Sequence, residues 1–205
     1  MSSQSRIGLL GGTFDPPHWG HLWLAELARV QLNLDRVLFL PAGEPVHKGD
    51  RAITAVSHRV QMVSLAIQDN PHFALDTTDC QRPPPHTTVS LLPLLQEAQP
   101  AARFWLLLGG DSLRDLPTWH KPDVLISHCR LAVLPRPGAE IDWESLQTAV
   151  PGCKTAVDLL SGPTLSISAT AIRTWAAMGH EPNYLVPTAV STYIQRHQLY
   201  RPTKT

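Results

Sequence analysis

The chain has 205 residues, of which 43% are hydrophobic and 17% charged, proportions that are ordinary for one globular domain. Its basic and acidic residues, 17 of each, cancel to a formal net charge of +0, which argues against nucleic acid or an anionic membrane surface as a partner. No uninterrupted apolar run approaches the ~20 residues of a membrane-spanning helix. The composition therefore predicts one soluble domain that covers residues 1–205.

Cysteine usage and the first residues of the chain favour a reducing compartment. Cys80, Cys129 and Cys153 are odd in number, far apart and without a CxxC pair, so neither a disulfide framework nor a zinc site is indicated. The N-terminal residues lack the apolar core of a secretory signal. We therefore expect a cytoplasmic protein without a metal site built from its own side chains.

The start of the chain reads as a strand, a helix and a second strand. Continuous apolar runs at 7–10 and 36–41 are typical of parallel strands that are buried on both faces. Between them, apolar residues recur every three to four positions and predict an amphipathic helix over 19–33. Elements in this order form a right-handed crossover.

The same alternation continues along the chain. We expect a helix at 57–69, strands near 73–79, at 103–108, at 131–134 and near 155–159, a helix from Ser168 to Met178 and a last helix opened by Pro187. Strands that alternate with helices predict an α/β fold with a doubly wound parallel sheet. A further helix follows Thr88, and because Pro93 would cost ~3 kcal/mol inside it, this helix is expected to be kinked or to begin near Ser90.

The first candidate site follows the first predicted strand, because ligands of a doubly wound sheet bind beyond the carboxyl ends of its strands. The chain here reads GGTFDPPHWGH over 11–21. The glycine pair lets a ligand approach the backbone, and the N–H groups of the next helical turn attract anions. His18 and His21 share one helical face, although a lone pair at this spacing is more often two unrelated histidines.

The second candidate site is the start of the helix at 168–178, where the chain reads ISATAIR over 167–173. Taken alone, this is an ordinary helix start with Ser168 as its N-cap and an arginine on the solvated face. Arg173 is nevertheless one turn from Thr170. Both side chains, with the first N–H groups of the helix, can therefore converge on a phosphate.

Together these strings resemble the GGTFDPxHxGH and ISxTxxR motifs of the nucleotidyltransferase superfamily, in the same order. Four further segments are similar to the PxxxPxHK, HRxxM, GxDS and tryptophan-bearing segments of bacterial nicotinate-nucleotide adenylyltransferases: Pro41–Lys48, His58–Met62, Gly109–Ser112 and Leu116–His120. The ending, Tyr193–Arg201, resembles the C-terminal helix of that family. The likeness covers the whole chain and implies a Rossmann-like nucleotidyltransferase fold, whose segment of about 165–205 closes the ATP site.

The resemblance also implies a reaction, in which the phosphate of nicotinate mononucleotide attacks the α-phosphorus of ATP in line, without a covalent intermediate. Its products are pyrophosphate and nicotinate adenine dinucleotide. The reaction would be a step of NAD biosynthesis. Because the nucleophile is already an anion, the enzyme has to position two polyanions and stabilise charge in the transition state. Mg²⁺ is expected as a cofactor that is bound mainly through the ATP phosphates.

The functional residues of the family carry over to the matching positions of this sequence. The catalytic residues would be His18, His21, Lys48 and Arg173. ATP would be bound by Gly11, Gly12, Thr13, Phe14, His18, Gly20, His21, Gly109, Asp111, Ile167, Ser168, Thr170 and Arg173. Nicotinate mononucleotide would be bound by Asp15, His47, Lys48, Thr88, Asp111, Trp119 and His120. In this last set, Trp119 would stack on the pyridine ring, and Thr88 with the His120 N–H would hold its carboxylate.

Two departures from the family pattern lie on the mononucleotide side. The chain reads His86-Thr87-Thr88 where relatives carry Ser-Tyr-Thr, and Asp79-Cys80-Gln81-Arg82 where they carry Glu-Leu-Lys-Arg. The first change removes an aromatic ring and keeps the final threonine. The second shortens the acid and keeps the base. Both changes bear on recognition of the pyridine nucleotide more than on the chemistry of ATP.

Two alternative functions stay open at the level of the sequence. One is the same reaction class with another acceptor: nicotinamide mononucleotide, phosphopantetheine, or an alcohol phosphate with CTP as donor. The other is a nucleotide-binding or regulatory module without catalysis, which the presence of His18, His21 and Arg173 argues against. The oligomeric state has no sequence signal, so formation of a homo-oligomer is left open.

Overall fold

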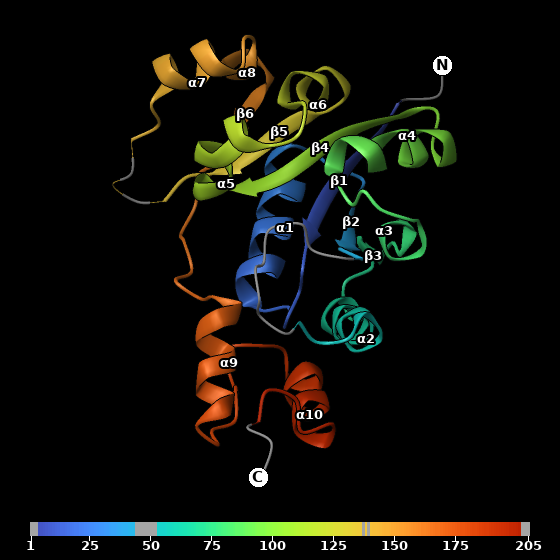
Figure 1. Cartoon of the computed structure of the whole chain (residues 1–205), viewed down its shortest axis with the longest axis vertical. Coiled ribbons are helices and arrows are strands. Elements are labelled where there is room, and N and C mark those ends of the chain that lie inside the picture. Colours follow the sequence, from blue (N-terminus) through green and yellow to red (C-terminus); the bar gives the residue numbers. More distant parts are fainter. Residues whose placement is uncertain (1–3, 44–52, 137, 139, 202–205) are drawn as a thin grey trace.

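The computed structural model describes residues 4–43, 53–136, 138 and 140–201, and Figure 1 shows a central sheet flanked by helices. The described residues form six strands: β1 (Ser5–Gly12), β2 (Arg36–Pro41), β3 (Phe73–Leu75), β4 (Ala102–Gly109), β5 (Arg130–Leu134) and β6 (Val157–Leu159). Their order is β3-β2-β1-β4-β5-β6, and all neighbours are parallel. The predicted doubly wound parallel sheet is confirmed, and its strand order reverses between β1 and β4.

The longer helices lie close to the positions that the sequence predicted. These are α1 (Trp19–Gln31), α2 (Val56–Ile67), α4 (Thr88–Ala98), α9 (Ala169–Ala177) and α10 (Thr188–Arg196). Gly179 follows α9 with a φ of +88°, a conformation that glycine adopts without strain and that ends the helix. Pro187 precedes α10 as its N-cap.

Several short helices were not predicted, because they span too few residues to show an apolar period. They are α3 (Thr78–Gln81), α5 (Gly110–Asp115), the 3₁₀ turn η1 (Leu116–Thr118), α6 (Pro122–His128), α7 (Trp143–Ala149) and α8 (Cys153–Ala156). Two of them shorten predicted strands. β3 ends at Leu75, because the Asp76 carboxylate accepts the N–H of Thr78 at 2.9 Å and turns the chain into α3. Thr155 lies in α8, so the last strand begins at Val157.

The start of α4 also differs from the expectation. The helix begins at Thr88 instead of near Ser90, and it continues past Pro93. The Thr87 hydroxyl accepts the N–H of Ser90 at 3.3 Å, and the Ser90 hydroxyl accepts the N–H of Thr87 at 3.3 Å. This reciprocal capping box stabilises the earlier start. The carbonyl that loses its partner to Pro93 is that of Val89, in the first turn.

The core has one layer on each face of the sheet. Ile7 and Leu9 of β1 pack with leucines of α4 and α6, whereas Leu10, which alternation along the strand turns to the other face, packs with α1 and α2. The sheet register pairs Gly12 with Pro41, so the loops after β1 and β2 begin side by side. Both loops lead to the carboxyl edge of the sheet.

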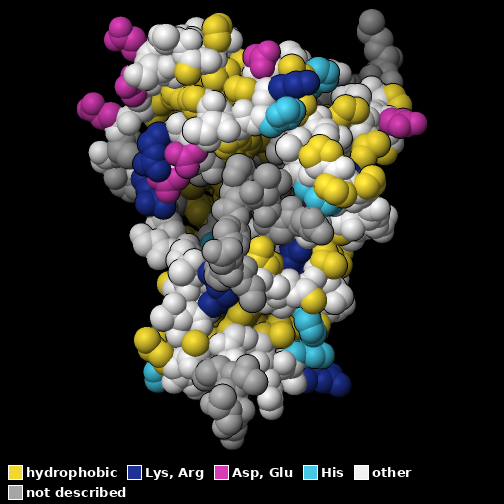
Figure 2. Space-filling model, viewed as in Figure 1, with side chains coloured by type: hydrophobic (Ala, Val, Ile, Leu, Met, Phe, Trp, Pro, Cys, Tyr) yellow, Lys and Arg dark blue, Asp and Glu magenta, His cyan; other side chains and the backbone are white. Residues whose placement is uncertain are grey.

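A smaller apolar cluster attaches the C-terminal helices at one end of the molecule (Figure 1). It joins α9 and α10 to α2 through Met62, Ile172, Val186, Val190 and Ile194. On the face seen in Figure 2, acidic side chains lie only over the upper half, with basic ones among them, whereas the lower half shows Lys, Arg and His side chains. Within the described part of the chain, no helix is both long and apolar enough to cross a bilayer.

Candidate active site

The loop between β1 and α1 is shaped around a buried aromatic ring. Phe14 is 2% exposed, has a φ of 50°, and packs edge-on against the His21 ring with 5.0 Å between centroids. A Cβ at Gly12 would lie 3.2 Å from the Phe14 ring, so a larger residue there would displace it. The absence of a side chain at Gly12 therefore leaves room for the Phe14 ring to pack against His21.

The two predicted histidines stack on each other at the start of α1. Their ring centroids are 3.8 Å apart, with an interplanar angle of 26°. The backbone N–H of His18 donates to Nδ1 of His21 at 3.2 Å. A neutral His21 consequently carries its proton on Nε2, because Nδ1 acts as the acceptor.

His18 is the more buried of the pair, at 7% exposure. Burial lowers the pKa of His18 to about 4, so the ring is neutral near pH 7. Its Nδ1 is buried and has no hydrogen-bond partner among the described residues. A Cβ at Gly20 would lie 3.0 Å from this atom, which explains why position 20 has no side chain.

The C-terminal motif reaches the same loop from α9. Ser168 caps the helix by accepting the N–H of Ala171 at 3.2 Å. Arg173 donates from Nη1 to the carbonyl of Asp15 at 2.6 Å and from Nη2 to the Thr170 hydroxyl at 2.9 Å. The structure therefore brings the two motifs together, and Arg173 does not lie on a solvated face.

The side chain of Asp15 is held in place as well as its backbone carbonyl. It is 1% exposed, and its Oδ1 accepts a hydrogen bond from the Tyr200 hydroxyl at 2.8 Å. Burial, together with the negative charge of Asp15, raises the pKa of Tyr200 far above its usual range. No role for Tyr200 was predicted, because its only signal was membership of the C-terminal segment that resembles the family.

A cavity of about 880 Å³ opens along the carboxyl ends of β1, β2 and β4. Its walls include predicted residues of both substrates, namely Gly11, Gly12, Thr13, His21, Thr88, Gly109, Trp119 and His120. Leucines of the sheet and of α4 form much of the remaining wall. One space thus connects the predicted phosphate loop with the predicted pyridine site.

Some predicted residues lie elsewhere. The Asp111 carboxylate pairs with Arg136 at 2.5 Å and with Arg114 at 3.6 Å, beside a second cavity of about 430 Å³. His47 and Lys48 lie outside the described residues. Phe14, Asp15, His18, Gly20, Ile167, Ser168, Thr170 and Arg173 are not part of the wall of the larger cavity.

A buried arginine, to which the sequence assigned no role, connects the loops at the cavity. Arg59 is 2% exposed and donates to three backbone carbonyls, those of Thr13 at 2.9 Å, Gly43 at 3.0 Å and Thr54 at 3.0 Å. Burial lowers the pKa of Arg59, against the opposing influence of nearby acidic groups. The residue links the loop after β1 to Gly43, just after the end of β2, and to Thr54, before α2.

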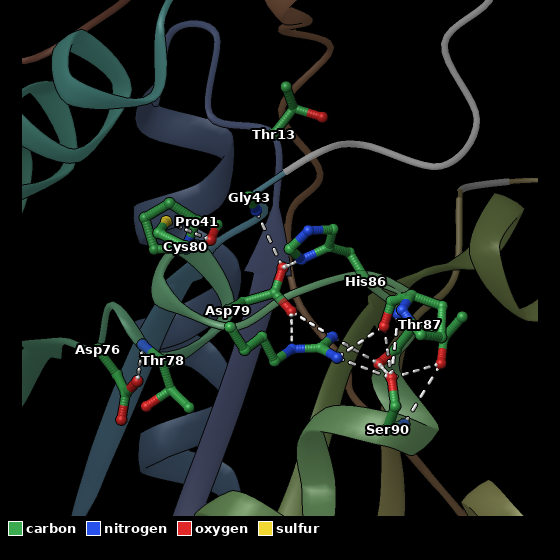
Figure 3. A network of polar contacts seen from close by, with 12 residues as sticks. Thr13, Pro41, Gly43, Asp76, Thr78, Asp79, Cys80, His86, Thr87 and Ser90 are labelled. Carbon is green, nitrogen blue, oxygen red and sulfur yellow. Dashed lines mark hydrogen bonds and ion pairs between the residues drawn. The ribbon is translucent and has the colours of Figure 1, made fainter.

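The two segments that depart from the family pattern form one polar network (Figure 3). Asp79 Oδ1 accepts two hydrogen bonds from the Arg82 guanidinium, and its Oδ2 accepts the N–H of Gly43 at 3.0 Å. Arg82 also donates to the carbonyl of Thr87 at 3.1 Å. His86 places Nδ1 at 3.6 Å from Asp79 Oδ2. Asp79 and His86 both line the larger cavity.

The cavity lies between the ends of β1 and β4, the point at which Rossmann-like sheets bind nucleotides. The fold and the position of the site therefore define a Rossmann-like nucleotide-binding protein. In agreement, the model of the family described as cytidylyltransferase-like matches residues 9–175, which shows that the chain belongs to that family.

Individual relatives identify a narrower family within the cytidylyltransferase-like proteins. A protein of Thermomicrobium roseum, named "Probable nicotinate-nucleotide adenylyltransferase", is 47% identical over 197 residues, covering 96% of this chain and 92% of that protein. One of the same name from Roseiflexus sp. is 43% identical over 199 residues, covering 97% and 100%. Within the cytidylyltransferase-like proteins, the chain thus belongs to the nicotinate-nucleotide adenylyltransferase family, as its motifs predicted.

Solved structures agree on the fold. The nicotinic acid mononucleotide adenylyltransferase of Plasmodium falciparum, complexed with NaAD, aligns with a TM-score of 0.74 at 22% identity. The alignment covers 96% of this chain and 97% of that one. The same enzyme complexed with APC aligns with a TM-score of 0.75.

Proposed function

We propose that this chain transfers the adenylyl group of ATP to nicotinate mononucleotide, forming nicotinate adenine dinucleotide and pyrophosphate in NAD biosynthesis. The observation that carries the proposal is the single cavity that joins the Gly11–Thr13 loop and His21 to Thr88, Trp119 and His120. A donor bound at the loop and an acceptor ring bound at the other end would then meet inside one space. The names of the relatives support the same reaction.

On the donor side, the loop after β1 and the start of α9 are proposed to hold ATP. The site would comprise Gly11, Gly12, Thr13, Phe14, His18, Gly20, His21, Gly109, Asp111, Ile167, Ser168, Thr170 and Arg173. Since Arg173 already bonds to the Asp15 carbonyl, the segment of about 165–205 is anchored on this loop. We propose that it closes the ATP site as part of one domain.

The chemistry needs no base, because the attacking oxygen belongs to a phosphate that is already ionised. This oxygen forms a bond to the α-phosphorus of ATP while the bond to the leaving pyrophosphate breaks. His21 can donate from Nε2, and His18 is a neutral imidazole that can donate without placing a fixed charge in the free site. Together with Arg173 and Lys48, they are proposed to stabilise charge on the transferring phosphoryl oxygens.

Mg²⁺ is proposed to enter with ATP. Its ligands are proposed to be phosphate oxygens and water. The described residues contain no group of three or more His, Cys, Asp or Glu side chains that could hold a metal ion. When bound, the ion neutralises phosphate charge. The protein's own contribution is then the placement of the two nucleotides.

On the acceptor side, Trp119 and the start of α4 are proposed to hold the pyridine ring, while Asp15, His47, Lys48 and Asp111 complete the proposed mononucleotide set. The N–H of His120 has no acceptor among the described residues. It and the Thr88 hydroxyl are therefore suited to donate to the ring carboxylate.

The reaction is proposed to take place in the cytoplasm. Cys80, Cys129 and Cys153 are free thiols, which is consistent with a reducing compartment. Formation of a homo-oligomer enters no step of the proposed mechanism.

The proposed function is tested by incubating the protein with ATP, Mg²⁺ and a panel of acceptors and identifying products by mass. The panel contains nicotinate mononucleotide, nicotinamide mononucleotide and phosphopantetheine. We expect nicotinate adenine dinucleotide and pyrophosphate in equal amounts. Binding of ATP without turnover for any acceptor would instead support a regulatory module.

A further inference from the structure

Two side-chain nitrogens in the described part of the chain are buried without a hydrogen-bond partner, Nδ1 of His18 and Nδ1 of His86. Buried polar atoms are nearly always paired, so an exception needs an explanation. For His18, the explanation is its place in the proposed catalytic site. His86 has no assigned role, although its side chain is only 6% exposed.

Hydrogen bonds and close packing hold the residues around His86 in place. Asp79 lies 3.6 Å from Nδ1, and the Asp79 carboxylate is itself held by Arg82 and by the Gly43 N–H. On the other side, a Cβ at Gly43 would come within 2.6 Å of His86 Cε1. The absence of a side chain at Gly43 therefore makes the space that the imidazole fills, between the end of β2 and the start of α4.

The other ring nitrogen of His86 has a different environment. Nε2 is not among the fully buried unpaired atoms, and it makes no hydrogen bond to a described residue. In Figure 3 it is turned away from Asp79, toward the side on which Thr13 lies. Both His86 and Thr13 line the larger cavity, as does His21. The imidazole thus presents one nitrogen to a carboxylate and the other to the substrate space.

We infer that His86 binds the phosphate of the acceptor mononucleotide through Nε2, and that Asp79 is the positioning residue that orients the ring. This inference rests on the proposed function, because the acceptor phosphate must approach the adenylyl donor at the Gly11–Thr13 loop. Arg82 balances the charge of Asp79, so the carboxylate does not repel the phosphate as an isolated anion would. As an imidazolium, which carries an N–H on both nitrogens, the ring can face the Asp79 carboxylate with Nδ1 and donate to a phosphate oxygen from Nε2.

The phosphate is shared by the acid and amide acceptors, whereas the ring carboxylate is not. Removing His86 should therefore weaken both acceptors by the same factor. We choose His86→Gln and His86→Leu, with His72→Gln as a matched control, because His72 is an exposed histidine immediately before β3. Thermal unfolding shows whether each variant folds. If His86→Leu does not fold, the test uses His86→Gln alone.

The measurements are kcat and KM for ATP, nicotinate mononucleotide and nicotinamide mononucleotide, and the inhibition constant of ribose 5-phosphate against the acceptor. We expect both acceptor KM values and the ribose 5-phosphate constant to rise by about 10- to 100-fold, the range for losing a hydrogen bond to a charged group. The KM for ATP and the kcat at saturating substrates should change by less than about threefold.

Asp79 is tested through its coupling to His86. Asp79→Asn should raise the acceptor KM in the wild-type background and have little further effect in the His86→Gln background, because a positioning residue acts only through the ring that it orients. Additive effects of the two substitutions would overturn the positioning role.

Three results would overturn the binding role of His86. Unchanged acceptor KM values would place the ring outside the substrate space. A rise for nicotinate mononucleotide alone would place it at the ring carboxylate, and a rise for ATP alone would place it on the donor side. If the wild type forms no dinucleotide with any acceptor, it is the proposed function that fails. The dissociation constant of ribose 5-phosphate, measured by calorimetry on the wild type and on His86→Gln, then still tests His86: it should rise by about 10- to 100-fold in the variant, and an unchanged constant would overturn the binding role.

Discussion

The hydroxyl of Tyr200 donates to the carboxylate of Asp15 at 2.8 Å, across 185 positions of the sequence. The same Asp15 receives Arg173 at its backbone carbonyl. The loop that is proposed to hold the ATP phosphates is therefore fastened to the C-terminal segment at two points. Its geometry therefore depends in part on Tyr200, which touches no substrate in the proposed mechanism.

Tyr200→Phe removes one of these points and keeps the ring. Loss of a hydrogen bond to a buried carboxylate costs ~1.5–3 kcal/mol, and for a chain of this length each kcal/mol lowers Tm by about 2–4 °C. We expect a Tm that is lower by about 5 °C and a raised KM for ATP. Tyr184→Phe, at a side chain that is 94% exposed, is the control. Equal Tm values for both variants would contradict the anchoring role.

Arg173→Lys should not behave as a conservative change. The guanidinium divides its donors between the Asp15 carbonyl and the Thr170 hydroxyl, and an ammonium group cannot reproduce this planar geometry. We expect kcat/KM for ATP to fall by roughly tenfold or more. The matched control is Arg196→Lys, an exposed arginine at the end of α10. Kinetics equal to those of the wild type would contradict a role for Arg173 in binding ATP.

His18→Ala and His21→Ala should each lower kcat by about 10²–10³, the range for removing one preorganised donor to developing charge. Both histidines sit at the first turn of α1, so the substitutions should leave the fold intact. Turnover at saturating ATP and acceptor measures the effect, with the exposed His128→Ala as the control. Near-normal turnover of either variant would contradict the catalytic role of the substituted histidine.

The depressed pKa of His18, about 4 against 6.5 for an ordinary histidine, predicts how stability depends on pH. Between these values the unfolded chain binds a proton that the folded chain does not, so stability falls as pH decreases from about 6.5 toward 4. The maximum loss from this group is about 3 kcal/mol. Urea unfolding at pH 7.5, 6 and 5 measures it, and His18→Gln should flatten the dependence. An equally steep dependence in His18→Gln would assign the effect to other groups.

The sequence predicted what local patterns encode. Apolar runs located the buried strands, and the strings around His18 and Arg173 identified the two motifs. The contact between Tyr200 and Asp15 was not predictable, because a long-range hydrogen bond leaves no periodic signal.

The network around Asp79 shows a similar limit. The sequence shows that Asp79 and His86 depart from the family pattern. It does not show that the fold packs both residues against Gly43. Asp111 illustrates the opposite case, since its motif was recognised whereas its pairing with Arg136 depends on the loop after β5.

The most direct test of the proposed reaction is kcat/KM for nicotinate mononucleotide against nicotinamide mononucleotide, under identical ATP and Mg²⁺. The Thr88 hydroxyl and the His120 N–H can donate to a carboxylate, whereas the NH₂ of a carboxamide would need an acceptor that a pocket of donors does not offer. An unpaired polar group of this kind costs ~1–3 kcal/mol, or about tenfold to a hundredfold in kcat/KM. We predict a preference for the acid of that size. Equal values, or a preference for the amide, would contradict the assignment of nicotinate mononucleotide as the acceptor.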